Sequence, residues 1–225
     1  MNTLLTESTF QFLNNLKENN NRDWMQEHKK EYLANENILK QFYSEVEKGL
    51  NTFDEISKRK IFRINRDIRF SKDKTPYNIH RSVSFARAGA QRRGGYYLRL
   101  EPGNSYMAGG FFSPEPKDLL RIRKEFEMDS SEIRGILENN DFKAAFDGFN
   151  TENTVKTAPK GFDKTDDNID LIKLKSFFVR HRFNDDEVFA EDFIEKLLFH
   201  YKLLIPFFDY MSLILTTDLN GESIL

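Results

Sequence analysis

The sequence has no cysteine among its 225 residues. Disulfide bonds, thiolate metal ligands and cysteine nucleophiles are therefore excluded. The first ten residues, MNTLLTESTF, have neither the basic nor the apolar region of a signal peptide, and no run approaches the roughly 18 apolar residues of a membrane-spanning helix. We expect a soluble, cytoplasmic protein with no membrane partner.

Standard nucleotide-binding and catalytic motifs are also missing, namely GxxxxGKS/T, GxGxxG, GxSxG, HExxH and the EF-hand loop. Imidazole groups come only from His28, His80, His181 and His200, which lie far apart in the sequence. A His and carboxylate metal site would need folding to bring such distant residues together, and we predict none. The sequence indicates no particular cofactor or catalytic residue, so it leaves open whether the protein is an enzyme.

The overall composition is typical of a globular protein. Hydrophobic residues make up 39% of the sequence and charged residues 31%, and Phe (22) is the main aromatic residue beside a single Trp. The length suits one domain, so we expect a single domain, 1–225. Its expected segments are a helical part (1–57), a β-rich basic part (58–112), a second helical part (113–150), a loop and strand (151–182) and C-terminal helices (183–225).

Apolar residues at intervals of three and four predict helices near both ends of the chain. A first helix ends at an Asn-rich break, 19–21, and a second, longer helix follows it. The apolar face of the second helix consists of Ile38, Leu39, Phe42, Val46 and Leu50.

A change of period to two predicts strands in the middle of the chain. In Ile61–Phe70, Arg66 interrupts a side that otherwise consists of Phe62, Ile64, Ile68 and Phe70. Further strands are predicted around Val83 and Phe85, and at Tyr96–Glu101, Tyr106–Phe112 and Ile172–Arg182. We therefore predict the α+β class, with a central, mostly antiparallel sheet flanked by N-terminal and C-terminal helices.

Positive charge is concentrated in this β-rich part. The net charge is only -2, but between Lys58 and Arg99 there are 13 Lys or Arg against two Asp, so this stretch carries +11 and the remainder -13. Such a separation of charge bears on partners and on electrostatic steering.

The run IFRINRDIRFSKDKTPYNIH, residues 61–80, resembles the signature of the family called domain of unknown function 2461. Further similar blocks are Asn20–Trp24, Glu101–Gly103, Pro159–Phe162 and Leu174–Phe177, so the resemblance covers most of the chain. Met25 and Asn78 depart from the family pattern, where an aromatic residue and a Lys are more usual. The resemblance implies an α+β fold and brings no established activity, cofactor or catalytic residue.

Forked guanidinium groups in this run suit the recognition of phosphate or carboxylate. We therefore predict a basic cleft for an anionic small molecule, formed by Arg63, Arg66, Asp67, Arg69, Lys74, His80 and Arg81. Within this set, Lys74 and His80 are candidates for an acid/base pair, whereas the alternative for the turn is that Asp73 only caps it. Arg66, on an apolar side, needs a carboxylate or a ligand as its partner.

Three alternatives to a small-molecule site remain at this point. The arginines can pair with the acidic helices, which is a purely structural role. The basic sheet can bind nucleic acid, with Tyr96 and Tyr97 as stacking surfaces. It can also dock an acidic partner or a second copy of the chain, although the sequence predicts no oligomeric state.

Overall fold

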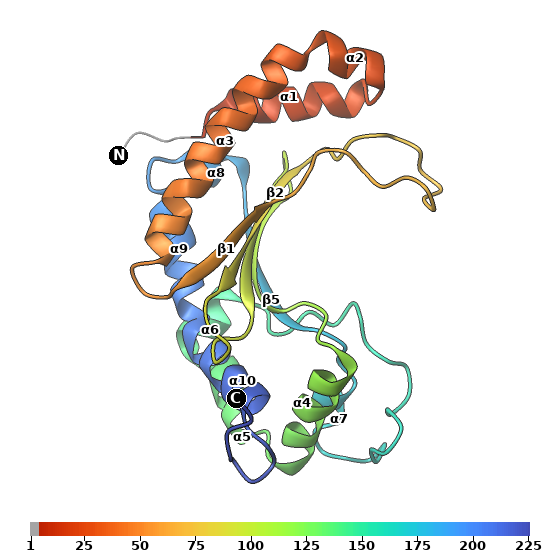
Figure 1. Cartoon of the computed structure of the whole chain (residues 1–225), viewed down its shortest axis with the longest axis vertical. Helices are drawn as coiled ribbons and strands as arrows, with labels where there is room; N and C mark the ends of the chain where they lie inside the picture. The colour runs from red at the N-terminus through yellow and green to blue at the C-terminus, as the bar shows by residue number, and fades with distance from the viewer. Residues whose placement is uncertain (1–4) are drawn as a thin grey trace. The chain divides into compact units, whose positions relative to one another are not determined.

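The computed structural model describes residues 5–225 (Figure 1). The helices are α1 (Glu7–Glu18), α2 (Arg22–Glu27), α3 (Lys29–Leu50), α4 (Pro116–Met128), α5 (Ser131–Glu138), α6 (Asn140–Ala145), α7 (Ile169–Ile172), α8 (Asp185–Phe189), α9 (Phe193–Leu203) and α10 (Ile205–Thr216). The strands are β1 (Ile56–Ile61), β2 (Arg81–Arg87), β3 (Gly95–Leu100), β4 (Ser105–Phe111) and β5 (Phe177–Phe183). They form one antiparallel sheet in the order β1-β2-β3-β4-β5, which confirms the predicted α+β class.

The chain divides into two compact units, each assembled from separate stretches of sequence. The first contains the described residues before Ala86 together with Tyr97–Met107 and Arg182–Phe199. The second contains Ala86–Tyr96, Ala108–His181 and His200–Leu225.

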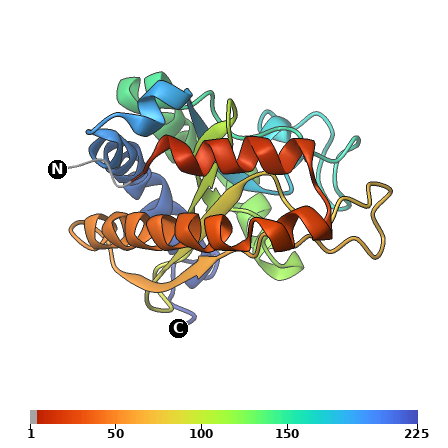
Figure 2. The same ribbon diagram turned by 90° about the horizontal axis from the view of Figure 1, so that it is seen from above.

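In the first unit, α1 and α3 lie side by side, joined through α2 (Figure 2). The predicted apolar face of α3 is confirmed at Leu39, Phe42, Val46 and Leu50, which are all buried. The Phe42 ring stacks on Phe193 with 5.9 Å between ring centroids. Burial of each such side chain contributes about 1.5–3 kcal/mol, so this face holds the helices to the core of the unit.

The predicted strand Ile61–Phe70 is wrong, because β1 ends at Ile61 and only Asn65 beyond it forms an isolated bridge, with Tyr77. The alternating pattern does continue, but the returning chain contains Pro76, which has no N–H to donate to a ladder. Phe70 also finds no apolar surface to cover it. Alternation alone therefore does not make a strand where the neighbouring segment cannot pair.

In the second unit, α10 supplies the centre of the core. Phe208 contacts the rings of Tyr96 and Phe111, and Phe207 contacts Phe149. The stretch Phe193–Thr216 is long and apolar enough to cross a membrane by length and composition, and half of its most apolar 18-residue window is buried inside the protein.

The predicted meander of Tyr96–Glu101 and Tyr106–Phe112 is confirmed as β3 and β4, and the short strand around Val83 as β2. The predicted strand Ile172–Arg182 is wrong in its first half. Residues 169–172 are α7, held by bonds such as that from Ile172 N–H to Asn168 O (N···O 3.0 Å), and β5 begins at Phe177. Adjacent buried Leu and Ile residues fit either a short helix or a strand, so the pattern does not separate the two.

Candidate functional site

The segment between β1 and β2 is an irregular hairpin, residues 62–80, which we call the basic hairpin. Its two legs are joined by the bonds from Asn78 N–H to Ile64 O (N···O 2.7 Å) and from Arg66 N–H to Pro76 O (2.8 Å). In Figures 1 and 2 the hairpin extends well beyond the ends of β1 and β2. Most of the predicted site residues are therefore carried on a projection of the first unit.

The turn between α1 and α2 fixes one leg of the hairpin. Asn20 Nδ2 donates to Tyr77 O (2.9 Å), and Asn20 Oδ1 accepts from Tyr77 N–H (3.1 Å). Ile64 on the opposite leg is buried. The base of the hairpin thus has both a polar and an apolar anchor.

Arg66 finds its required partner inside the hairpin. Its Nη1 donates to the Asp73 carboxylate and to Thr75 O (3.0 Å). Asp73 Oδ1 also accepts from Thr75 N–H (2.9 Å), which confirms that Asp73 caps the turn. These bonds, Thr75 N–H first and Arg66 second, hold the pKa of Asp73 below its usual value.

A second ion pair lies at the tip. Arg69 donates from Nε to Asp67 Oδ1 (2.9 Å) and from Nη2 to Oδ2 (2.6 Å), which lowers the pKa of Asp67. Lys74 Nζ donates to Ile68 O (2.9 Å). The tip is therefore ordered by its own side chains, and both of its carboxylates are used in doing so.

Three cations of the hairpin form no ion pair in the described part of the chain, namely Arg63, Lys72 and Lys74, although Arg63 contributes to the lowered pKa of Asp67. All three side chains are exposed. Phe70 lies between Arg69 and Ser71 and is 96% exposed, with the Arg69 guanidinium 6.0 Å from the centre of its ring. The tip thus combines an exposed aromatic ring with the positive charge of Lys72 and Lys74, whereas Arg63 lies nearer the base, beside Ile64.

His80 and Arg81 lie apart from this tip, where the hairpin enters β2; His80 is half-buried and Arg81 is buried. Arg81 is 3% exposed and donates from Nε and Nη2 to the two carboxylate oxygens of Glu36 (2.6 and 2.8 Å), and from Nη1 to Phe62 O (2.8 Å). Burial, and then the nearby Arg99 guanidinium, lowers the pKa of His80 to about 4. His80 is therefore neutral near pH 7. Lys74, the other residue of the predicted acid/base pair, is at the exposed tip and donates to Ile68 O.

The sequence prediction missed the group around Glu36. Burial raises the pKa of Tyr32, as does Glu36, to which Tyr32 is hydrogen bonded. The Tyr43 hydroxyl is buried and has no hydrogen-bond partner. A signal was present in the sequence, because Glu36 lies on the same helical stripe as Tyr32, Leu39 and Tyr43. A carboxylate in such a stripe indicates a buried cation opposite it.

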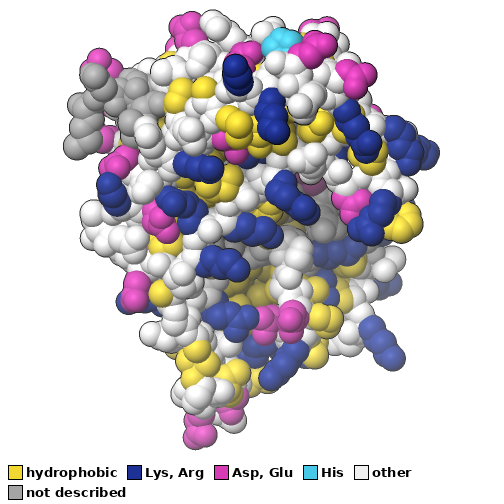
Figure 3. All heavy atoms as spheres, turned by 45° about the horizontal axis from the view of Figure 1, so that its top comes forward, with side chains coloured by type: hydrophobic (Ala, Val, Ile, Leu, Met, Phe, Trp, Pro, Cys, Tyr) yellow, Lys and Arg dark blue, Asp and Glu magenta, His cyan; other side chains and the backbone are white. Residues whose placement is uncertain are grey.

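Many other cations of the basic segment are also neutralised. At least seven of the 13 pair with carboxylates, namely Arg59, Arg66, Arg69, Arg81, Arg87, Arg93 and Arg99. Pairing with acidic side chains of helices is thereby confirmed for Arg59, Arg81, Arg87 and Arg93. Figure 3 nevertheless shows Lys and Arg side chains spread among hydrophobic ones over the face that it draws.

Among residues 5–225, no group of three or more His, Asp or Glu side chains has an arrangement that could hold a metal ion.

Comparison with known proteins identifies the family of the chain. No curated protein and no solved structure matches it. A family model described as "Conserved hypothetical protein (DUF2461)" matches residues 8–210, which include both the basic hairpin and Glu36. The match confirms the resemblance seen in residues 61–80, and the chain belongs to this family.

Proposed function

We propose that the basic hairpin binds single-stranded nucleic acid, with Phe70 as a stacking surface for a base and with Arg63, Lys72 and Lys74 as contacts to phosphates. The observation that carries the proposal is the 96% exposure of Phe70 at a tip with unpaired cations. A Phe side chain left in water forgoes the roughly 1.5–3 kcal/mol that burial would give it. Stacking on a base, with cations beside it, would recover part of that free energy.

The proposal keeps the anion-binding chemistry predicted from the sequence and changes the size of the ligand. The seven predicted residues differ in exposure. Arg81 is buried and already paired with Glu36. The half-buried ones are Arg66 and His80, and the exposed ones are Arg63, Asp67, Arg69 and Lys74. Phosphates repeat along a strand, so cations spaced along a projecting hairpin can each contact a different one.

Order within the tip supports the same proposal. The pairs Arg66 with Asp73 and Arg69 with Asp67 fix the chain on both sides of Phe70. A loop that is ordered before binding loses less conformational entropy when its ligand arrives. Asp67 and Asp73 therefore stabilise the tip through their ion pairs. Because each carboxylate is paired with an Arg, it repels a phosphate less than a free carboxylate would.

The direct test measures fluorescence anisotropy of labelled single-stranded RNA and DNA at low salt. Phe70→Ala should weaken binding about fivefold or more, because one stacked base contributes about 1–3 kcal/mol. Phe199→Ala is the matched control, since Phe199 is also an exposed Phe of the first unit (59%) but lies outside the hairpin. Equal affinities for the two variants would show that Phe70 has no stacking role.

A small anionic ligand gives a different result in a thermal-shift experiment. If the hairpin binds strands, inorganic phosphate and nucleoside monophosphates should stabilise the protein far less than an oligonucleotide does at equal concentration. Stabilisation by a mononucleotide as large as that by the oligonucleotide would instead favour the small-molecule site and overturn the proposal.

A further inference from the structure

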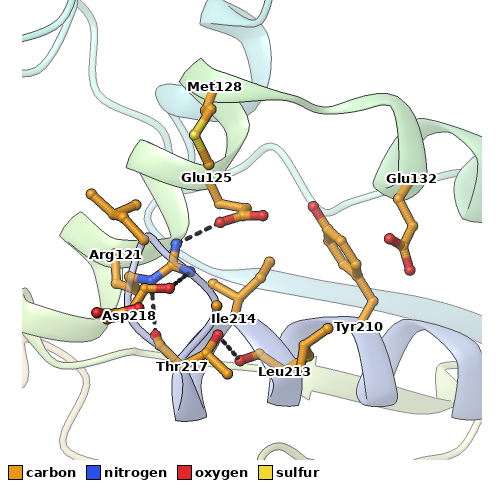
Figure 4. Close-up of a pocket in the computed structure, with 11 residues that line it drawn as sticks. Arg121, Glu125, Met128, Glu132, Tyr210, Leu213, Ile214, Thr217 and Asp218 are labelled. Carbon is orange, nitrogen blue, oxygen red and sulfur yellow. Dashed lines mark hydrogen bonds and ion pairs between the residues drawn. The ribbon is translucent and has the colours of Figure 1, made fainter. Parts of the chain in front are cut away.

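A pocket of about 330 Å³ lies wholly within the second unit, in the size range of sites for small organic ligands (Figure 4). Its walls come from α4, α5, α10 and the turn that follows α10. The lining residues that matter below are Glu125, Met128, Glu132, Tyr210, Leu213 and Ile214. None of them belongs to the basic hairpin, so the pocket is separate from the proposed nucleic-acid site.

The pocket is lined by a phenol that has no hydrogen-bond partner in the protein. Tyr210 is 6% exposed. Its hydroxyl makes no hydrogen bond with residues 5–225, and it is not one of the fully buried atoms without a partner, so it is open to the pocket. Figure 4 shows the Tyr210 ring between Glu125 and Glu132, with the hydroxyl directed away from α10. Burial, and then the Glu125, Glu132 and Asp129 carboxylates, raises the pKa of Tyr210, so the phenol stays neutral. A hydroxyl open to the pocket can hydrogen bond to water or to a ligand that displaces that water.

The only cation lining the pocket is already neutralised. Arg121 Nη1 donates to Glu125 Oε2 (2.6 Å), and its other nitrogens donate to the backbone oxygens of Thr217 and Asp218 (3.1 Å each). The Asp218 carboxylate accepts backbone N–H groups of the C-terminal turn. Glu132 has no ion pair among the described residues, so one carboxylate and one phenol remain for a ligand.

The rest of the pocket lining that matters here is apolar. Leu213 and Ile214 of α10 lie along one side, and Met128 of α4 lies on another. Leu213 and Met128 are among the most exposed large hydrophobic side chains of the protein, although they line a cavity. They offer a surface on which an apolar chain can lie.

We infer that this pocket binds a primary alkylammonium ligand. The ammonium group would donate hydrogen bonds to the Glu132 carboxylate and the Tyr210 hydroxyl oxygen, and the alkyl chain would cover Leu213 and Met128. An ammonium has three donors and no acceptor, which matches the carboxylate that α5 contributes to the pocket and the phenol oxygen that α10 contributes. A carboxylate ligand of equal length would meet Glu132 with like charge.

The test uses n-hexylamine, with n-hexanol and hexanoate as ligands of the same chain length, in calorimetric titrations at pH 7. Hexylamine should bind, and hexanol and hexanoate should bind at least tenfold more weakly. Glu132→Gln should weaken hexylamine binding at least tenfold, as expected for a hydrogen bond to a charged group. Glu138→Gln, on the same helix but at an exposed residue paired with Lys143, should bind as the wild type does.

Tyr210→Phe removes only the hydroxyl and should weaken hexylamine binding by roughly tenfold, with circular dichroism showing whether the fold is kept. Glu132 is exposed, so Glu132→Gln keeps the test decisive even if Tyr210→Phe unfolds. The inference is overturned if millimolar hexylamine does not bind, if hexanol or hexanoate binds as well, or if Glu132→Gln and Glu138→Gln have equal affinities. None of these results depends on nucleic acid.

Discussion

Arg81 is predicted from the sequence to bind an anionic ligand, but in the fold it has a structural role. Its guanidinium is almost fully buried and makes three hydrogen bonds, two of them to Glu36. The sequence indicates that a cation is present but not that a carboxylate from α3 reaches it. By contrast, the need of Arg66 for a partner and the capping role of Asp73 could both be predicted, because they depend only on nearby residues.

Removing one partner of the buried pair should be costly. We expect Glu36→Gln to lower the free energy of unfolding by about 3–5 kcal/mol, because it leaves the Arg81 charge buried without a carboxylate. Urea denaturation measures this change.

A double variant and a surface pair serve as controls. Glu36→Leu combined with Arg81→Leu should cost much less than the sum of the single changes, since no buried charge remains. Glu138→Gln, at an exposed pair, should change stability by less than about 1 kcal/mol. A small effect of Glu36→Gln would contradict the structural role given to the pair.

His80 should make stability depend on pH between neutrality and about pH 4. Its pKa is lowered from 6.5 to about 4 in the folded protein. As the pH falls through 6.5, the unfolded chain takes up a proton that native His80 does not, so the free energy of unfolding decreases until the pH reaches about 4. His80→Gln should lose less stability than the wild type between pH 7 and pH 5 in urea titrations, and identical losses would contradict this reading.

At the scale of elements, the sequence predicts those helices and strands that depend on local patterns and on the turns beside them. β3 and β4 follow from alternating residues around the Pro102, Gly103 and Asn104 turn, and α3 from its apolar stripe. The basic hairpin has the alternation of a strand but pairs through few backbone bonds, because its return leg contains Pro76 and its tip is closed by side chains. Whether alternation gives a strand depends on the neighbouring segment, which periodicity does not describe.

The close approach of β4 and β5 depends on Gly110. Its φ is +147°, and an added Cβ would lie 2.2 Å from Phe177 O and 2.5 Å from Phe178 Cα. Gly110→Ala should therefore destabilise the protein by at least about 2 kcal/mol in thermal or urea unfolding. Gly135→Ala provides the contrast, because this helical position faces open space and should gain up to about 1 kcal/mol. Equal effects at the two glycines would contradict the described packing of β4 against β5.

At the scale of the whole molecule, the net charge of the protein and the local charge of the basic segment have opposite signs. The protein carries -2 overall, whereas Lys58–Arg81 has nine Lys or Arg and two Asp, a local charge of +7. The sequence could predict this separation of charge. It could not predict which cations are neutralised by ion pairs, since the pairing of Arg59 and Arg81 with α3 arises only from tertiary structure. The pocket around Glu132 and Tyr210 was likewise not predictable, because its walls come from distant parts of the chain.

The salt dependence of oligonucleotide binding tests the central claim most directly. Each phosphate contact to a single strand contributes a slope of about -0.7 to log K against log salt, so three contacts from Arg63, Lys72 and Lys74 should give a slope near -2. Replacing Arg63 and Lys72 by Ala should reduce its magnitude by about 1.4, whereas Lys160→Ala, at an exposed Lys outside the hairpin, should leave it unchanged. The account is contradicted if no binding occurs at low salt, or if the hairpin variant and Lys160→Ala give the same slope.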